Sequence, residues 1–254
     1  MLHLNNLKNL SFLVYGLGST GNSVVKFFVK KGVKNYFVWD DNKTIRKNFK
    51  SNSVSNLQNT LNKVDYIVLS PGISLNKPKN KKNLFKFKKK IITDIDLLFL
   101  SSSNFKSIIV TGSNGKSTTC KMISHLMRKN GFNVELGGNI GNPVLNFKLK
   151  KNTHLIIEAS SFQLSHSKLI RPDYAILLNI TNDHLDWHGT MKHYINSKFK
   201  LFKLQEKKNF AIVEKKYSNL FKKKKYLSKL ISIKLKNYLS IKNKIKNNYL
   251  KLKI

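Results

Sequence analysis

Short apolar runs recur along the chain, and the stretches between them have the spacing of helices. The runs lie at 11–16, 35–40, 65–70, 107–112, 154–160, 173–180 and 209–213. Apolar runs with little alternation are typical of parallel strands that are buried on both faces. The helix-like segments Thr20–Lys31 and Lys116–Asn130 are each followed by a glycine, Gly32 or Gly131, as helices commonly are. The pattern predicts an α/β protein whose parallel sheets are flanked by helices.

The length of 254 residues is enough for about two domains. A boundary is expected near 92–106, where the helix-like segment TDIDLLFL runs into the polar stretch SSSNFK before a new strand begins. We therefore predict a first domain over 1–93 and a second over 94–254.

The formal charge of +36 would ordinarily suggest a nucleic-acid partner. However, 45 of the 48 basic residues are lysine and a further 31 residues are asparagine, so the charge reflects a general bias toward these two residues. Nucleic-acid recognition usually needs arginine for bidentate contacts, and we predict no nucleic-acid partner. Within the lysine-rich stretch 207–254, the alternating segment 226–246 fits either a strand or an amphipathic helix.

The single cysteine, Cys120, excludes a disulfide framework. No apolar run reaches the roughly 20 residues of a membrane span, and no signal peptide is recognisable at the N-terminus. We expect a cytoplasmic monomer.

Residues 107–119, SIIVTGSNGKSTT, combine a strand, a glycine-rich turn and a Lys-Ser-Thr sequence that opens a helix. Backbone N–H groups of such a turn and the helix dipole face an anion, the lysine contacts phosphates, and the serine hydroxyl can bind Mg²⁺. A strict Walker A motif would have glycine at Val110, so this is a shorter form of the loop. The sequence predicts ATP or GTP binding through Lys116 and Ser117.

A second glycine-rich loop, GLGSTG at 16–21, follows the first predicted strand, and Asp40 ends the next one. By itself this spacing is typical of dinucleotide binding, with the acid on a ribose hydroxyl, and an NAD-dependent dehydrogenase is the obvious alternative. No set of residues for hydride transfer follows, and the same loop geometry would hold any nucleotide diphosphate.

Glu158 ends a predicted strand, and His184 lies in the loop after the next one. In a parallel sheet both would reach the carboxyl edge beside the phosphate loop, where a carboxylate and an imidazole suit a hard cation. A single histidine is more often structural, and Lys198 would by default be an exposed lysine.

Four motifs occur in a recognisable order: TGSNGKST at 111–118, GGNIG at 137–141, EASSFQL at 158–164, and NDHLDWHGTMKHY with SKFKLF between 182 and 202. In this order they resemble the ATP-dependent Mur ligases of peptidoglycan synthesis. GLGSTG, SPGIS at 70–74 and TDIDLLF at 93–99 look like the member that adds D-glutamate. The resemblance covers about residues 11–202. It implies a Rossmann-like N-terminal domain for a UDP-linked substrate, followed by a P-loop ATPase-like central domain.

The resemblance also implies three sets of site residues. ATP would bind Thr111, Gly112, Ser113, Asn114, Gly115, Lys116, Ser117 and Thr118. The UDP-linked substrate would contact Ser19, Thr20, Asp40, Asp41, Ser70, Pro71 and Gly72 in the first domain, and Asn139 and Ser160 in the second. Mg²⁺ would be held by Ser117, Glu158, His184 and Lys198, the lysine as a carbamate, and Lys116, His184 and Lys198 would be catalytic.

The implied reaction joins UDP-N-acetylmuramoyl-L-alanine to D-glutamate through an acyl phosphate made with ATP, a step of cell-wall synthesis and thus of cell shape and division. These ligases have a third, C-terminal domain that supplies the D-glutamate site, and this sequence is expected to lack it. A partial sequence, a truncated gene and a non-catalytic binder of the UDP-precursor or ATP are alternative explanations. A related ligase that extends folate is a further alternative, which the UDP-type first domain disfavours.

Overall fold

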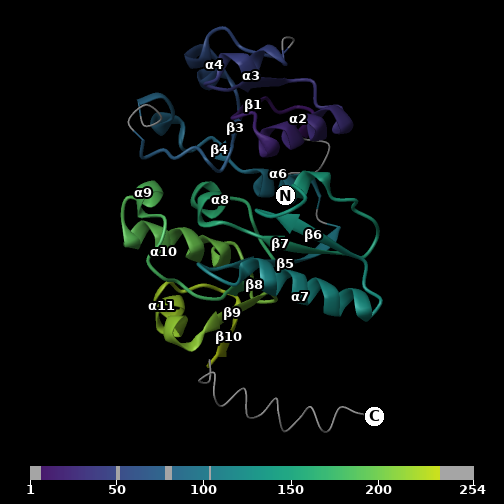
Figure 1. Cartoon of the computed structure of the whole chain (residues 1–254), viewed down its shortest axis with the longest axis vertical. Coiled ribbons are helices and arrows are strands. Elements are labelled where there is room, and N and C mark those ends of the chain that lie inside the picture. The colour runs from purple at the N-terminus through teal and green to yellow at the C-terminus, as the bar shows by residue number, and fades with distance from the viewer. Residues whose placement is uncertain (1–6, 50–51, 78–81, 103, 235–254) are drawn as a thin grey trace.

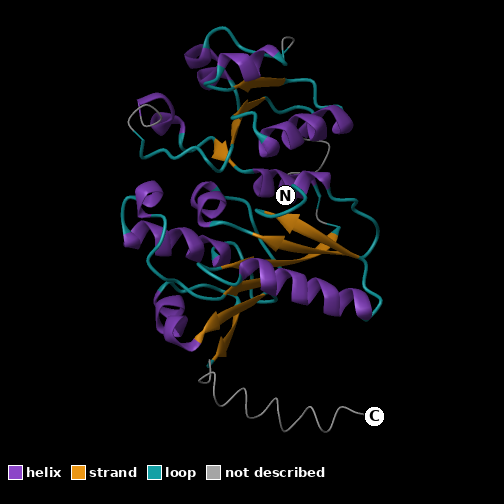
Figure 2. Cartoon of the chain, viewed as in Figure 1, coloured by secondary structure: helices purple, strands orange, loops and turns teal. Residues whose placement is uncertain are grey.

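The computed structural model describes residues 7–49, 52–77, 82–102 and 104–234. They form two α/β lobes, the first at the top of Figure 1 and the second below it, with one helix between them. In Figure 2 the strands of each lobe gather into a sheet of its own.

The sheet of the first lobe has the strand order β2-β1-β3-β4, with all pairs parallel. Its strands are β1 (Phe12–Tyr15), β2 (Tyr36–Trp39), β3 (Tyr66–Leu69) and β4 (Ile91–Ile92), and its helices are α2 (Ser19–Lys31), α3 (Lys43–Lys47), α4 (Leu57–Lys63) and the 3₁₀ turn η1 (Phe85–Phe87). All four residues of β1 are buried. This explains why the central strand reads as a continuous apolar run.

The sheet of the second lobe has the order β10-β9-β8-β5-β7-β6 and is also entirely parallel. Its strands are β5 (Phe105–Thr111), β6 (Val134–Gly138), β7 (Thr153–Glu158), β8 (Tyr174–Leu177), β9 (Phe210–Glu214) and β10 (Lys229–Ile233). Its helices are α7 (Lys116–Lys129), α8 (Ser161–His166), α9 (Leu185–His188), α10 (Met191–Phe199) and α11 (Ser218–Lys223), with 3₁₀ turns η2 (Val144–Asn146), η3 (Lys200–Phe202) and η4 (Lys215–Tyr217). The carboxyl ends of β5, β7 and β8 therefore lie side by side, at the edge where ligands of such sheets bind.

Helix α6 (Asp94–Ser101) joins the lobes and is held to both. Thr93 and Asp96 form a capping box at its start. The Asp96 carboxylate, fully buried, also accepts hydrogen bonds from the Ser167 hydroxyl at 2.6 Å and from the backbone N–H groups of Lys168 and Leu169. One buried carboxylate thus links the start of α6 to the segment after α8.

The structure confirms the predicted fold class, and each of the seven apolar runs overlaps a strand. The predicted helices at Thr20–Lys31 and Lys116–Asn130 correspond to α2 and α7, and the left-handed Gly32 ends the first of them. The sequence did not predict β4 or β6. The lysine-rich stretch contains α11 and then β10, and its part beyond residue 234 lies outside the described residues. Within the described ranges, no helix has the length and apolar character needed to cross a membrane.

Candidate active site

The phosphate loop lies between the end of β5 and the start of α7. Gly115 has φ +81°, a left-handed conformation that glycine adopts without steric cost, and the helix begins at the next residue. The first N–H groups of a helix have no partner within it, and the helix dipole makes this end attractive to anions. The turn predicted from the sequence is therefore present, with Lys116 and Ser117 in the first turn of α7.

Asn179, which follows β8, holds this loop in shape. Its side-chain oxygen accepts from the backbone N–H groups of Ser113 at 3.1 Å and Asn114 at 2.9 Å, and its amide donates to the Asn114 carbonyl at 3.0 Å. Two of the loop N–H groups expected to face a phosphate are thus used internally, which leaves the first turn of α7 as the anion-binding end. Asn179 was not predicted from the sequence, because it acts on the loop from 65 residues away along the chain.

Two lysines meet at the Gly112 carbonyl. Lys116 Nζ lies 3.0 Å from this oxygen and 2.8 Å from the Ser113 carbonyl, and Lys198 Nζ lies 2.8 Å from the Gly112 carbonyl. Lys198 is only 1% exposed. Burial, followed by the charge of Lys116, lowers the pKa of Lys198 to about 7. The site therefore combines Lys116 with a buried amine that is partly neutral near pH 7.

Glu158 is 1% exposed at the end of β7, where two side chains bond to it. Ser117 Oγ donates to Glu158 Oε2 at 2.7 Å, and Asn139 Nδ2 donates to Oε1 at 3.0 Å. Gly138 makes the approach of Asn139 possible, because a Cβ there would lie 2.3 Å from the Glu158 carbonyl oxygen and its φ is +113°. The glycine pair of GGNIG thus brings an amide beside the buried carboxylate.

Tyr194, on α10, connects the phosphate loop to the histidine segment. Its hydroxyl lies 2.8 Å from Ser113 Oγ, and Lys198 Nζ lies 4.6 Å from its ring centroid. The ring of His184 lies 6.3 Å from that of Tyr194 and 4.7 Å from that of Phe162. Tyr194 ends the motif at 182–194, but no role for this residue was predicted from the sequence.

His184 has a left-handed backbone, with φ +53°, and its Nδ1 lies 3.3 Å from Asp183 Oδ1. The described contacts of its ring are with Asp183 and with aromatic side chains, whereas Ser117, Glu158 and Asn139 bond to one another directly.

The oxygens of Ser117 and Glu158 suit a hard cation such as Mg²⁺, and their 2.7 Å hydrogen bond places both at the anion-binding end of α7. Over the described residues, no group of three or more His, Cys, Asp or Glu side chains is gathered in a form that could hold a metal. A cation here would therefore draw on other ligand types as well, and hydroxyl, carbamate, phosphate and water oxygens are all of the kind Mg²⁺ accepts.

Two acids, Asp40 and Asp41, lie beside the first glycine loop, and Asp40 bonds to it directly. Asp40 accepts from the backbone N–H of Leu17 at 2.7 Å, and Asp41 accepts from the Tyr15 hydroxyl and the Trp39 indole, both at 3.1 Å. The loop is thus fixed to the carboxyl ends of β1 and β2.

The other residues predicted for substrate binding have clear positions. Ser19 and Thr20 lie in the first turn of α2, and Ser70 Oγ donates to the Gly16 carbonyl at 2.7 Å, just before the turn that contains Pro71 and Gly72. Ser160 caps α8 through a reciprocal pair of bonds with Gln163.

Residues 10–92 match the family model "Mur ligase MurD-like, N-terminal domain", and residues 110–252 match "Mur ligase middle domain". These matches favour the ligase resemblance over the dehydrogenase interpretation of the first glycine loop.

Several curated relatives are named UDP-N-acetylmuramoylalanine--D-glutamate ligase. The protein of that name from Rickettsia felis is 43% identical over 210 residues, covering 79% of this chain and 45% of its own length. The one from Wolbachia pipientis wMel is 39% identical over 206 residues, covering 79% and 40%. The chain thus spans about half the length of the curated relatives it matches.

A solved structure supports the fold. UDP-N-acetylmuramate:L-alanyl-gamma-D-glutamyl-meso-diaminopimelate ligase from Neisseria meningitides superposes with a TM-score of 0.53 at 14% identity, covering 88% of this chain and 77% of that one.

Proposed function

The chain belongs to the Mur ligase family, and we propose that it forms the nucleotide-binding and precursor-binding part of the ligase that adds D-glutamate to UDP-N-acetylmuramoyl-L-alanine. We further propose the division into a precursor-binding domain over 1–93 and an ATP-binding domain over 94–254. A cytoplasmic location and a monomeric state belong to the same proposal.

One observation carries this proposal most directly. At the carboxyl edge of the second sheet, the start of α7 lies against Lys116, with the buried amine of Lys198 beside it, and against an acidic group, Glu158 bonded to Ser117. Lys116 favours a polyphosphate, and the buried acid with its hydroxyl partner favours a cation bound to that polyphosphate. This is the arrangement that phosphoryl transfer from ATP needs.

The first step would activate the precursor. Its L-alanyl carboxylate attacks the γ-phosphorus of ATP, the bond from the γ-phosphorus to the bridging oxygen breaks, and ADP leaves. Lys116 would neutralise charge on the transferring phosphoryl group, and the backbone fixed by Asn179 would keep the loop in one shape. Removing a single preorganised donor from such a site commonly costs about 10²–10³ in rate.

In the second step, the amine of D-glutamate attacks the acyl carbon and phosphate leaves, while the amine loses a proton. In the family the D-glutamate contacts belong to the C-terminal domain, so the present residues would hold the acyl phosphate rather than the incoming amino acid. Asn139, placed beside Glu158, is the residue we propose to orient the muramoyl end of the precursor.

Mg²⁺ would supply charge neutralisation between the phosphates when it is bound. Ser117 and Glu158 would hold it, with His184 and carbamylated Lys198 as further ligands. Carbamylation needs a neutral amine that attacks carbon dioxide and then releases a proton. The pKa of about 7 at buried Lys198 supports this assignment, because a large fraction of the amine is neutral at physiological pH.

The test is substrate-dependent phosphate release, measured with the protein as it occurs in its source. We expect phosphate to appear from ATP only when UDP-N-acetylmuramoyl-L-alanine and D-glutamate are both present, and L-glutamate is the matched control for the amino acid. Phosphate release that does not depend on the precursor, or that depends on a folate substrate instead, would contradict the proposal.

A further inference from the structure

The turn that follows β3 is bonded directly to the segment that begins at His184. This turn, residues 70–74, contains three of the residues predicted to contact the precursor. Its last residue, Ser74, is fully buried, and the Ser74 hydroxyl donates to the backbone carbonyl of Trp187 at 3.0 Å. The Asn76 amide donates to the same carbonyl at 2.9 Å. Both bonds run from the first lobe to the second.

The carbonyl that receives these two bonds lies in the last turn of a very short helix. Helix α9 has four residues, and the last carbonyls of a helix have no partner within it. An isolated helix of this length is unstable in water, so contacts outside the helix must hold it in place. The first lobe thus caps the carboxyl end of α9 with two side-chain donors.

His184 is fixed through the same turn of helix. Its carbonyl accepts from the backbone N–H groups of Trp187 at 3.2 Å and His188 at 3.0 Å. Its own backbone is left-handed, with φ +53°, a conformation that is costly for residues other than glycine and persists where the surroundings enforce it. A displacement of the Trp187 carbonyl would therefore move His184 as well.

The side chains of α9 pack on the second lobe. The ring centroid of Trp187 lies 4.9 Å from that of Phe162 and 5.3 Å from that of His166. His188 Nε2 lies 3.0 Å from Ser161 Oγ. These contacts hold the helix against α8, and the two donors from the first lobe hold its carboxyl end.

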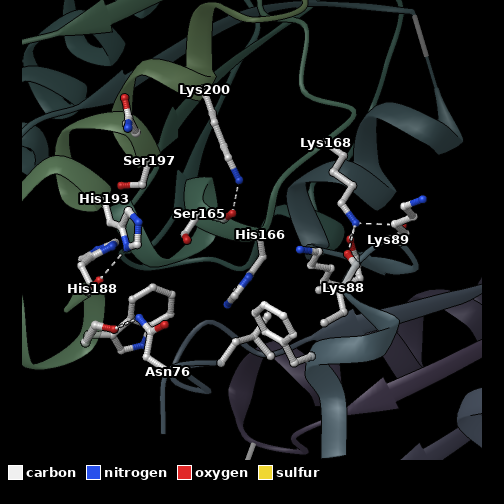
Figure 3. Close-up of a pocket in the computed structure, with 15 residues that line it drawn as sticks. Asn76, Lys88, Lys89, Ser165, His166, Lys168, His188, His193, Ser197 and Lys200 are labelled. Atoms are coloured by element: carbon white, nitrogen blue, oxygen red, sulfur yellow. Dashed lines mark hydrogen bonds between the residues drawn. The ribbon is translucent and has the colours of Figure 1, made fainter. Parts of the chain in front are cut away.

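A second connection between the lobes lies apart from α9. Lys168 Nζ donates to the backbone carbonyls of Lys88, Lys89 and Ile91 in the first lobe. In Figure 3 this connection lies at the right of the cavity between the lobes, whereas Asn76 lies at the left. The lobes would therefore stay connected if the two bonds to α9 were lost.

We propose that Ser74 and Asn76 are positioning residues, which hold the His184 segment in place from the lobe that binds the precursor. The inference rests on the proposed function, in which His184 acts at the metal and the turn 70–74 contacts the precursor. It adds that the lobe carrying the precursor also sets the position of a group at the phosphate-loop site. Misplacing a group in such a site by about 1 Å can lower the rate about 100-fold.

The sharpest test compares two pairs of substitutions. Ser74→Val with Asn76→Ala removes both donors, whereas Ser74→Thr with Asn76→Gln keeps a hydroxyl and an amide at these positions. We expect the donor-free pair to lower kcat for precursor-dependent phosphate release at least about 10-fold, while the KM values for ATP and precursor change less than about 2-fold. The conservative pair should recover most of kcat, which a loss of packing alone would not explain.

Amide hydrogen exchange follows the segment itself, with neither substrate nor metal present. The backbone N–H groups of residues 187–189 bond back to the first carbonyls of this helical turn. We expect them to exchange at least about 10-fold faster in the donor-free pair, because the helix loses its cap. Exchange in β5 and α7 should be unchanged, which separates this local effect from a general loss of stability.

Lys168→Met is the matched control, because it removes the other connection between the lobes and leaves both bonds to α9. We expect it to leave kcat and the exchange of residues 187–189 near the wild-type values. The inference is overturned if the donor-free pair has a normal kcat, if its α9 amides exchange as slowly as in the wild type, or if Lys168→Met has an equal effect. If the wild type shows no precursor-dependent release but the donor-free pair still accelerates exchange in α9, the ligase assignment fails and the positioning of α9 by the first lobe stands.

Discussion

The two glycine loops of this chain share a pattern and differ in charge. Each follows a buried strand and leads into a helix, α2 in one case and α7 in the other. The first is fixed by a carboxylate, because Asp40 accepts from the Leu17 N–H. The second is fixed by the neutral amide of Asn179 and lies against two lysines, Lys116 and Lys198.

This difference indicates what each loop can bind. An anion beside the first loop meets the carboxylates of Asp40 and Asp41, which are better suited to accept from the hydroxyl or N–H groups of a ligand. An anion beside the second loop meets cations and the start of a 14-residue helix. The glycine spacing thus fixes the backbone, and the neighbouring charges determine which end of a nucleotide the loop attracts.

Replacing Lys116 tests the second loop most severely. We expect Lys116→Ala to reduce ATP-dependent acyl phosphate formation by about 10³-fold, because the charge that faces the transferring phosphoryl group is lost. Lys121→Ala, at an exposed position on the same helix, is the matched control, and its rate of acyl phosphate formation should be near normal. Precursor-dependent ADP release measures phosphoryl transfer by both variants. Near-normal transfer by Lys116→Ala would show that this lysine does not distinguish the second glycine loop from the first.

The first glycine loop should be most sensitive to an added side chain at Gly21. A Cβ at Gly21 would lie 1.9 Å from the Gly16 carbonyl oxygen, so Gly21→Ala must displace the backbone of the loop. We expect a loss of about 3 kcal/mol in the free energy of unfolding, measured by urea denaturation. Gly18→Ala is the control, because a Cβ at Gly18 meets no atom within 4 Å, and its cost should be about 1 kcal/mol or less. Equal effects would show that close packing does not set the shape of this loop.

The parts of the fold that the sequence predicted are those in which burial leaves a continuous apolar run, as in β1 and β7. Strand β6 was missed because its sequence, VELGG, carries a charge and two glycines, and its glycines serve close packing against Asn142 and Glu158. Strand β10 lies at the edge of its sheet, and its alternation with lysine left helix and strand equally possible.

Local pattern predicts Lys116 and Ser117 as site residues, because both lie in one continuous strand, turn and helix start. Asn179 and Tyr194 act on the phosphate loop from 65 and 81 residues away along the chain, so no local spacing reveals them. The left-handed backbone of His184 was equally hidden, since histidine rarely adopts it.

Replacing Asn179 should have a smaller effect than replacing Lys116 or Gly21. Asn179→Ala removes three hydrogen bonds to the loop, and each is worth about 0.5–1.5 kcal/mol. We expect ATP affinity to fall about 10- to 30-fold, as measured by calorimetry, because part of the loss is recovered by relaxation of the loop. Asn182→Ala, which is exposed nearby, should change affinity little. An unchanged affinity in Asn179→Ala would mean that the loop keeps its shape without the amide.

The last prediction concerns helix α6, which joins the two lobes. Asp94 is 2% exposed, and its burial raises its pKa from 3.8 to about 6, against the opposing hydrogen bond from Gln163. Between pH 4 and 6 the folded protein therefore keeps a proton that the unfolded chain has lost. Its contribution to stability decreases as pH rises through this window and is constant above it.

Asp94→Asn should flatten this slope, which for one group is at most about 1.4 kcal/mol per pH unit. An amide in place of the acid can still accept from Gln163, so the junction itself should remain intact. Urea unfolding at several pH values measures the slope, with Asp186→Asn as a control that removes an exposed carboxyl from α9. A slope that persists in Asp94→Asn would assign the pH dependence of stability to groups in the lobes. The helix that joins the two lobes would then be insensitive to protonation.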